Sequence, residues 1–203
     1  NDLWEDEKRR NEFEQTLSSV FAKIKPFTVR ETKDSAGIEL PQKNVENIAV
    51  DLEESQRQLY ASYQAELRAE IVRDGVLVDD DAEDILKRLL RLVQIASNPG
   101  LVDHSYSSTP GKLPPLVALV ERAVAENTKI IVWTNFIENA EWLADELSGF
   151  GCAHVHGSRS MAERNDAIRA FKTDPSIRVL VATPGAAKEG LTLTMASHAV
   201  FFD

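Results

Sequence analysis

The sequence predicts an α/β protein in which a parallel sheet with flanking helices is preceded by a mainly helical segment. After residue 111, short apolar runs alternate with amphipathic helical patterns, which is typical of a parallel sheet covered on both faces. Before residue 110, apolar residues recur at helical spacing. The segment between them, 105–115, is rich in Ser, Thr, Pro and Gly, which indicates a loop. We therefore divide the chain into a mainly helical region, 1–110, and an α/β region, 111–203.

The helical region contains three stretches in which apolar residues follow a helical period, at 4–22, 53–73 and 82–97. A short extended piece is expected at 45–50. Acidic residues just before the third helix suit the positive end of the helix dipole, and Asn-Pro-Gly directly after it ends the helix.

The α/β region alternates strictly between the two kinds of element. We expect helices at 113–125, 137–148 and 161–171, and strands at 129–133, 152–156, 178–183 and 198–202. The carboxyl ends of parallel strands meet at one edge of a sheet, and binding sites in such sheets lie in the loops at that edge.

The composition excludes several classes of protein. The chain has 203 residues, of which 43% are hydrophobic, and this is enough to bury a core. No apolar run approaches the roughly 20 residues that span a bilayer, so we expect no membrane partner. The single cysteine, Cys152, allows no internal disulfide and favours a reducing compartment, either the cytoplasm or, in a eukaryote, the nucleus. The net charge of −10 by itself argues against a nucleic-acid binder.

Several motifs of catalysis and cofactor binding are missing from the sequence. Neither the phosphate loop G-x-x-x-x-G-K-[ST] nor the dinucleotide fingerprint G-x-G-x-x-G occurs. No serine lies in a G-x-S-x-G turn. We expect His154 and His156 to face opposite sides of their strand, and therefore not to ligate a metal together.

Four loops that follow strands carry the residues with binding potential. They are small, hydroxylated or glycine-rich, and they comprise 134–136, 157–159, 183–190 and Asp203. Such loops offer backbone N–H groups and hydroxyls, which bind phosphates or a phosphodiester backbone. Any one of them by itself is better explained as an ordinary turn, whereas four at one edge of a sheet favour a function.

Five blocks of the chain, within about residues 19–203, resemble the Swi/Snf-type ATPases, which are double-stranded DNA translocases of helicase superfamily two. The order, spacing and content of the blocks agree with that family. The blocks are KIKPFTVRETKDSAGIELPQKNVENIAVDLEESQRQLY, GKLPPLVALV, KIIVWTNFIENAEWLADEL, HVHGSRSMAERNDAIRAFKTDPSIRVLVATP and GAAKEGLTLTMASHAVFFD.

The resemblance implies that 111–203 is most of a C-terminal RecA-like lobe, preceded by a linker and helical protrusion. It implies two groups of site residues. DNA contacts are expected from Asn135, Phe136, Gly157, Ser158, Thr183 and Lys112. The nucleotide cleft is expected at Glu189, Gly190 and Asp203.

The resemblance also implies partners and cofactors. The full-length enzyme is expected to use ATP and Mg²⁺, with the magnesium ligands and the arginine finger outside these 203 residues. The partners are double-stranded DNA, the first RecA-like lobe, and other proteins through the helical region. The chain alone is expected to be inactive, since it holds no catalytic residue of the family.

Two departures from the family pattern keep alternatives open. Glu31 replaces the second of two adjacent arginines, and 186–190 replaces a Gly-Gly-x-Gly run with a version that carries a charged pair. Together with the acidic charge, they leave room for a degenerate RecA-like module that binds proteins but not DNA. A small α/β enzyme acting on a phosphorylated metabolite is a third hypothesis, with Glu189 and Asp203 as the only loop bases.

Overall fold

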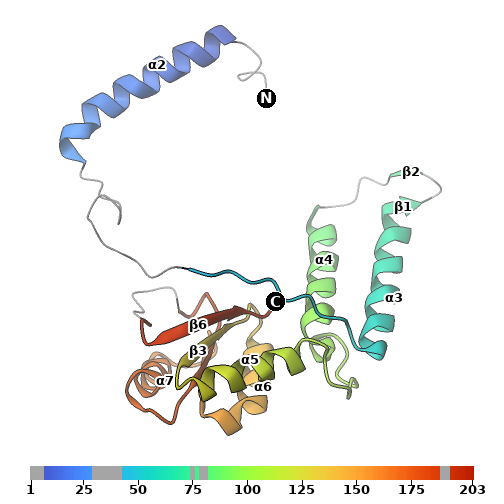
Figure 1. The fold of residues 1–203 in the computed structure, drawn as a ribbon. Helices are drawn as coiled ribbons and strands as arrows, with labels where there is room; N and C mark the ends of the chain where they lie inside the picture. Colours follow the sequence, from blue (N-terminus) through green and yellow to red (C-terminus); the bar gives the residue numbers. More distant parts are fainter. Residues whose placement is uncertain (1–6, 29–42, 74–75, 78–81, 188–192) are drawn as a thin grey trace. The chain divides into compact units, whose positions relative to one another are not determined.

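The computed structural model describes residues 7–28, 43–73, 76–77, 82–187 and 193–203 (Figure 1). The chain divides into two compact units, 1–47 and 48–203. In the first unit the described residues form α2 (Glu7–Ile24) and a 3₁₀ turn (Lys25–Phe27). The helix predicted at 4–22 is therefore confirmed from Glu7 onward, and residues 4–6 lie outside the described residues.

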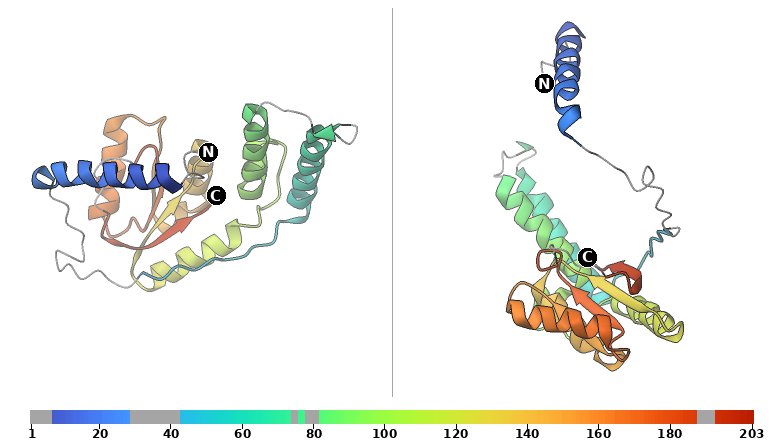
Figure 2. Two further views of the ribbon diagram at one scale, coloured as in Figure 1. Left: turned by 90° about the horizontal axis from the view of Figure 1, so that it is seen from above. Right: turned by 90° about the vertical axis from the view of Figure 1, so that its left-hand side faces the viewer.

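The second unit begins with a helical hairpin made of α3 (Glu54–Ile71) and α4 (Ala82–Ser97), which lie side by side (Figures 1 and 2). Between them β1 (Val72–Arg73) pairs antiparallel with β2 (Val76–Leu77). The predicted helix at 53–73 thus ends two residues early. The dipeptide Asp-Gly at 74–75 is a common hairpin signal in a sequence. The prediction gave more weight to the helical spacing of the apolar residues before it.

The remaining elements of the second unit form a four-stranded sheet with helices. They are α5 (Leu113–Ala125), β3 (Lys129–Trp133), α6 (Ile137–Glu146), β4 (Cys152–Val155), α7 (Met161–Thr173), β5 (Val179–Ala182) and β6 (Ala196–Phe201). The strand order is β4-β5-β3-β6, and all neighbours are parallel. Every helix and strand predicted for 111–203 is present, with ends shifted by no more than two residues. The helix predicted at 137–148 ends at Glu146, and a 3₁₀ turn, Ser148–Phe150, follows it.

Helices cover both faces of the sheet, as the continuous apolar strands predict. On β3, Ile130 and Val132 belong to the core formed with α5 and α6, whereas Ile131 belongs to the core formed with α7. Phe171 of α7 is fully buried in that second core. Neighbouring residues of a strand point to opposite faces, so each central strand contributes to both cores. This packing holds the carboxyl ends of the strands in place.

A buried glutamine joins the helical hairpin to the sheet. Gln56 of α3 donates to the carbonyl oxygen of Ile95 (2.8 Å) and accepts from the amide of Gly111 (2.9 Å). Gly111 has no side chain at a point where a Cβ would lie 2.2 Å from the carbonyl oxygen of Asp51. These contacts place α3 and α4 in one compact unit with the sheet. The boundary between the two compact units falls at 47/48, so the described residues of the helical hairpin and the α/β region 111–203 lie in the same unit. The division at 110/111 stays a prediction about the organisation of the chain.

A second contact strengthens the same junction. The hydroxyl of Tyr106 donates to the carboxylate of Glu53 (3.0 Å). The pKa of Glu53 is lowered to about 2, first by the Ser55 hydroxyl and then by the amides of Ser55 and Gln56 and by Tyr106. The pKa of Tyr106 is raised to about 12, first by its burial and then by the Glu53 carboxylate.

We predict that Gly151→Ala lowers the free energy of unfolding by more than about 1 kcal/mol. Gly151 has φ +71°, and a Cβ there would lie 1.9 Å from the carbonyl oxygen of Ser176. Gly149→Ala is the matched control, because nothing lies within 4 Å of its Cβ position. Urea denaturation of both variants tests this, and equal stabilities would contradict the strain assigned to Gly151.

We also predict an acid dependence of stability from Glu53. Its pKa in the folded protein, about 2, lies below the ordinary pKa of a glutamate, so its stabilising effect is complete above that ordinary pKa and is lost as the pH falls toward 2. Glu53→Gln should flatten this part of the curve of unfolding free energy against pH. Glu54→Gln is the control for removing a carboxylate from the same turn. Identical slopes for the wild type and Glu53→Gln would show that the Glu53 contacts do not stabilise the fold.

Candidate functional site

The carboxyl ends of the four strands lie at one level of one edge of the sheet. Trp133, the last residue of β3, is in register with Ala182 of β5 and Phe201 of β6, and Ala182 is also in register with Val155 of β4. The four loops singled out in the sequence therefore begin side by side. We refer to this edge, formed by 134–136, 156–159, 183–187 and 202–203, as the rim.

The rim has a buried polar layer beneath exposed small residues. The first residue after each of three neighbouring strands is polar and almost fully buried: Thr134 is 1% exposed, His156 2% and Thr183 6%. The residues that follow, Asn135 and Ser158 among them, are exposed. A buried polar group is stable only with a partner, so this layer positions the loops above it.

Asp203 holds the end of β6 against the loop after β3. Its carboxylate accepts hydrogen bonds from the Thr134 hydroxyl (2.9 Å), from the backbone amide of Asn135 and from the side-chain amide of Asn139 (3.2 Å). The Thr134 hydroxyl also accepts from the amide of Phe136 (3.3 Å). One carboxylate thus orders the whole loop that leads into α6.

Asn139 extends this network to the helical hairpin, and sequence analysis did not identify it. It is fully buried on α6, and its amide also donates to the hydroxyl of Ser97 (3.0 Å), the last residue of α4. Both partners accept from the amide nitrogen, which fixes the orientation of the side chain and leaves its oxygen with no partner among the described residues. The sequence did contain a signal for it: Asn139 directly precedes Ala140, one of the apolar residues that the predicted helix turns toward the core.

Lys112 is engaged inside the lobe. Its ammonium group donates to the carbonyl oxygen of Phe202 (2.8 Å) and lies 5.7 Å from the centre of the Phe202 ring. Burial lowers the pKa of Lys112, and the nearby Asp203 carboxylate acts in the opposite direction. The residue therefore ties the start of α5 to the end of β6, next to the rim.

Thr183 closes the turn after β5 with its backbone. Its amide donates to the carbonyl oxygen of Val155 (2.9 Å), and its own carbonyl accepts from the amide of Ala186 (3.1 Å). Within the described part of the chain, no hydrogen bond engages its hydroxyl. Glu189 and Gly190, predicted to line a nucleotide cleft, lie outside the described residues.

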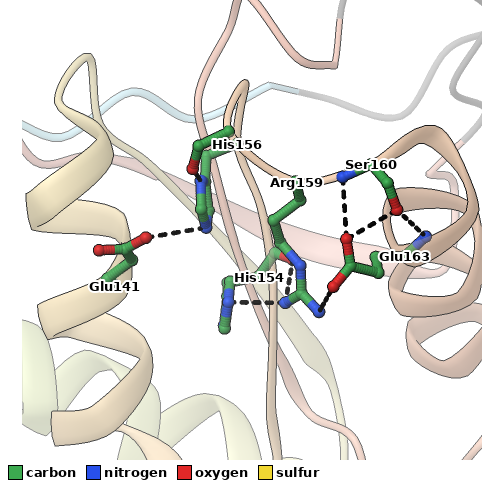
Figure 3. Close-up of polar contacts among 7 residues, drawn as sticks. Glu141, His154, His156, Arg159, Ser160 and Glu163 are labelled. Atoms are coloured by element: carbon green, nitrogen blue, oxygen red, sulfur yellow. Dashed lines mark hydrogen bonds and ion pairs between the residues drawn. The ribbon is translucent and has the colours of Figure 1, made fainter.

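The expectation that His154 and His156 face opposite sides of their strand is wrong. Their rings are stacked, with centres 5.2 Å apart and planes inclined by 15°. The reason is simple: residues two apart on a strand share a face, and only immediate neighbours alternate. Figure 3 shows the two rings beside Glu141 of α6 and Arg159 of the rim.

The histidines have distinct partners (Figure 3). The Arg159 guanidinium lies 2.6 Å from His154 Nε2, and the Ser158 hydroxyl lies 2.8 Å from His156 Nδ1. His156 Nε2 faces the Glu141 carboxylate at 3.7 Å. Burial is the main cause that lowers the pKa of both histidines, and Arg159 acts in the same direction while Glu141 opposes it.

Two negative findings concern the described residues only. They contain no cluster of three or more His, Cys, Asp or Glu side chains that could hold a metal ion. None of the helices they form is long and apolar enough to cross a bilayer.

The part of the chain that carries the rim is similar to a known protein family and to solved structures. The family described as "Helicase conserved C-terminal domain" matches residues 111–203. The solved C-terminal domain of a Sulfolobus solfataricus SWI2/SNF2 ATPase is similar, with 27% identity and a TM-score of 0.68, over 78% of this chain and 71% of that one. Residues 111–203 are a helicase C-terminal domain, similar to that of a SWI2/SNF2 ATPase. The resemblance found in the sequence is thus confirmed, and the RecA-like lobe with it.

Two longer matches include the helical region that precedes the helicase C-terminal domain. The S. solfataricus SWI2/SNF2 ATPase core, solved in complex with double-stranded DNA, is 28% identical with a TM-score of 0.71, over 92% of this chain and 41% of that one. An "Uncharacterized ATP-dependent helicase" of Mycoplasma genitalium is 26% identical over 97% of this chain. This chain spans 19% of that relative's length.

We predict that Asn139→Ala destabilises the helicase C-terminal domain by about 1–3 kcal/mol, because the buried Ser97 hydroxyl and the Asp203 carboxylate lose a donor. Asn135→Ala, four residues away, removes an exposed side chain and is expected to change stability by less than about 0.5 kcal/mol. Thermal and urea unfolding of both variants measures the difference. A neutral Asn139→Ala would mean that the network does not stabilise the domain.

Proposed function

We propose that this chain supplies the second RecA-like lobe of an ATP-dependent double-stranded DNA translocase, in which the rim binds the DNA backbone and forms one wall of an ATP cleft. The observation that carries the proposal is the in-register alignment of four strand ends. The similarity to a SWI2/SNF2 ATPase core solved with double-stranded DNA supports it.

The proposed DNA track uses the exposed parts of the rim. Asn135, Gly157 and Ser158 present amides, a hydroxyl and a glycine backbone at the ends of β3 and β4. The half-buried Phe136 lies next to Asn135. The remaining DNA contacts are proposed for Thr183 and Lys112, which lie beside these exposed residues. Hydroxyls and backbone amides bind phosphate without reading bases, which suits a motor that moves along any sequence.

ATP and Mg²⁺ are proposed as cofactors of the full-length protein. Several relatives are described as ATP-dependent helicases. In this proposal Asp203, with Glu189 and Gly190, faces the nucleotide from the second lobe, and the first RecA-like lobe holds the phosphates and the magnesium. This chain by itself is then a DNA-binding part without ATPase activity.

Duplex binding by the full chain tests the DNA track. A random-sequence duplex should bind at low salt, and its affinity should fall steeply between 50 and 200 mM salt, as about 0.9 counterion is released per phosphate contact. Thr183→Ala should weaken binding at least threefold. Thr128→Ala, a threonine at the opposite edge of the sheet, is the matched control. No measurable affinity at low salt would overturn the proposal in favour of a protein-binding module.

The catalytic half of the proposal needs the full-length protein. Its ATP hydrolysis is expected to rise when duplex DNA is added, and Thr183→Ala should reduce that stimulation while basal hydrolysis and folding persist. ATP turnover that is insensitive to DNA would contradict a translocase.

A further inference from the structure

His156 is a buried titratable side chain directly beneath the proposed DNA track. It is 2% exposed, and its Nε2 has no hydrogen-bond partner among the described residues. Its other nitrogen, Nδ1, lies 2.8 Å from the hydroxyl of Ser158, which is exposed at the rim. The buried ring therefore lies between the carboxylate of Glu141, whose side chain is 55% exposed, and the Ser158 hydroxyl at the rim.

The contact with Arg159 determines the protonation state of His154, the histidine that is stacked on His156. Arg159 is always charged and can only donate, so His154 Nε2, at 2.6 Å from its guanidinium, must be an acceptor. His154 is therefore neutral, with its hydrogen on Nδ1. Of the two stacked rings, only His156 is free to take up a proton.

The surroundings of His156 select one neutral tautomer. With the hydrogen on Nε2, the ring points a donor at the Glu141 carboxylate 3.7 Å away, and the bare Nδ1 accepts from the Ser158 hydroxyl. The opposite tautomer would aim a bare, buried nitrogen lone pair at a carboxylate, which is costly. In the favoured tautomer the only hydrogen of the Ser158 hydroxyl is used inside the protein.

We propose that His156 positions the Ser158 hydroxyl for a DNA phosphate and takes up one proton when that phosphate binds. The inference rests on the proposed DNA-binding function of the rim. A proton from solvent adds to Nδ1, which then donates to the Ser158 oxygen, while Nε2–H remains directed at Glu141. The Ser158 hydroxyl hydrogen is released and turns outward to a phosphate oxygen. No other bond changes.

Charged groups face the ring from every element packed against it. Glu141 lies on α6, Arg159 belongs to the rim, Glu163 lies on α7, and His154 is the stacked neighbour on β4. In the unbound protein, burial and Arg159 lower the pKa of His156, and the two glutamates act in the opposite direction. A phosphate anion at Ser158 adds negative charge beside the ring and raises that pKa.

The sign of the effect follows from linkage. If the pKa of His156 is higher in the DNA complex than in the free protein, binding takes up a proton between the two values, and affinity rises as the pH falls through them. One proton gives at most about a tenfold change in affinity per pH unit. We expect the affinity for duplex DNA to increase by about three- to tenfold when the pH is lowered from 7.5 to 5.5.

The experiment combines NMR titration of the histidine rings with duplex affinity in the full chain at low salt. The pKa of His156 should rise when a random-sequence duplex is added, and the affinity should increase toward pH 5.5. Ser158→Ala, at an exposed position, should weaken binding severalfold and abolish the pH dependence that His156 causes. His156→Gln should bind with no such dependence, since the glutamine amide donates to Ser158 at every pH. His198→Gln is the control, because that histidine lies on β6, near the opposite edge of the sheet from the rim.

Two failures are distinguishable. Duplex binding with an unchanged His156 pKa, or a pH dependence that persists in Ser158→Ala, would overturn the inference and leave the DNA track intact. Absence of any duplex binding at low salt would overturn the proposed function and the inference with it.

Discussion

The parallel, in-register pairing of four strands is the constraint on which the site depends. Because β4, β5, β3 and β6 end at one level, the residue after each strand is delivered to the same edge. The two apolar cores hold this register, since a shift by one residue would turn every strand side chain to the wrong face. The rim is therefore a product of core packing, although none of its exposed residues belongs to the core.

Buried polar contacts convert that edge into ordered loops. The carboxylate of Asp203 accepts hydrogen bonds from the loop after β3 and from Asn139. Asn139 also donates to the hydroxyl of Ser97 at the end of α4. Gln56 of α3 makes a second connection, to the carbonyl oxygen of Ile95 in α4 and to the amide of Gly111 in the loop before α5. The helical hairpin is thus hydrogen-bonded to the rim through Asn139 and to the loop before α5 through Gln56.

The acidic charge of the chain is compatible in physical terms with the DNA binding proposed for the rim. The net charge of −10 describes the whole sequence, whereas phosphate recognition depends on local donors. At the rim those donors are amides, hydroxyls and the guanidinium of Arg159, with Lys112 nearby.

The sequence by itself determined the order and approximate ends of the helices and strands, because the spacing of apolar residues is a local property. It also located the loops after the strands, since strands and turns are recognised from neighbouring residues. Only the tertiary structure decided the strand order, the bond between Asn139 and Ser97 across 42 residues, and the place of α3 and α4 in the same compact unit as the sheet. It also placed His156 between Glu141 and Ser158, on different elements. These features depend on contacts between distant parts of the chain, which local patterns do not encode.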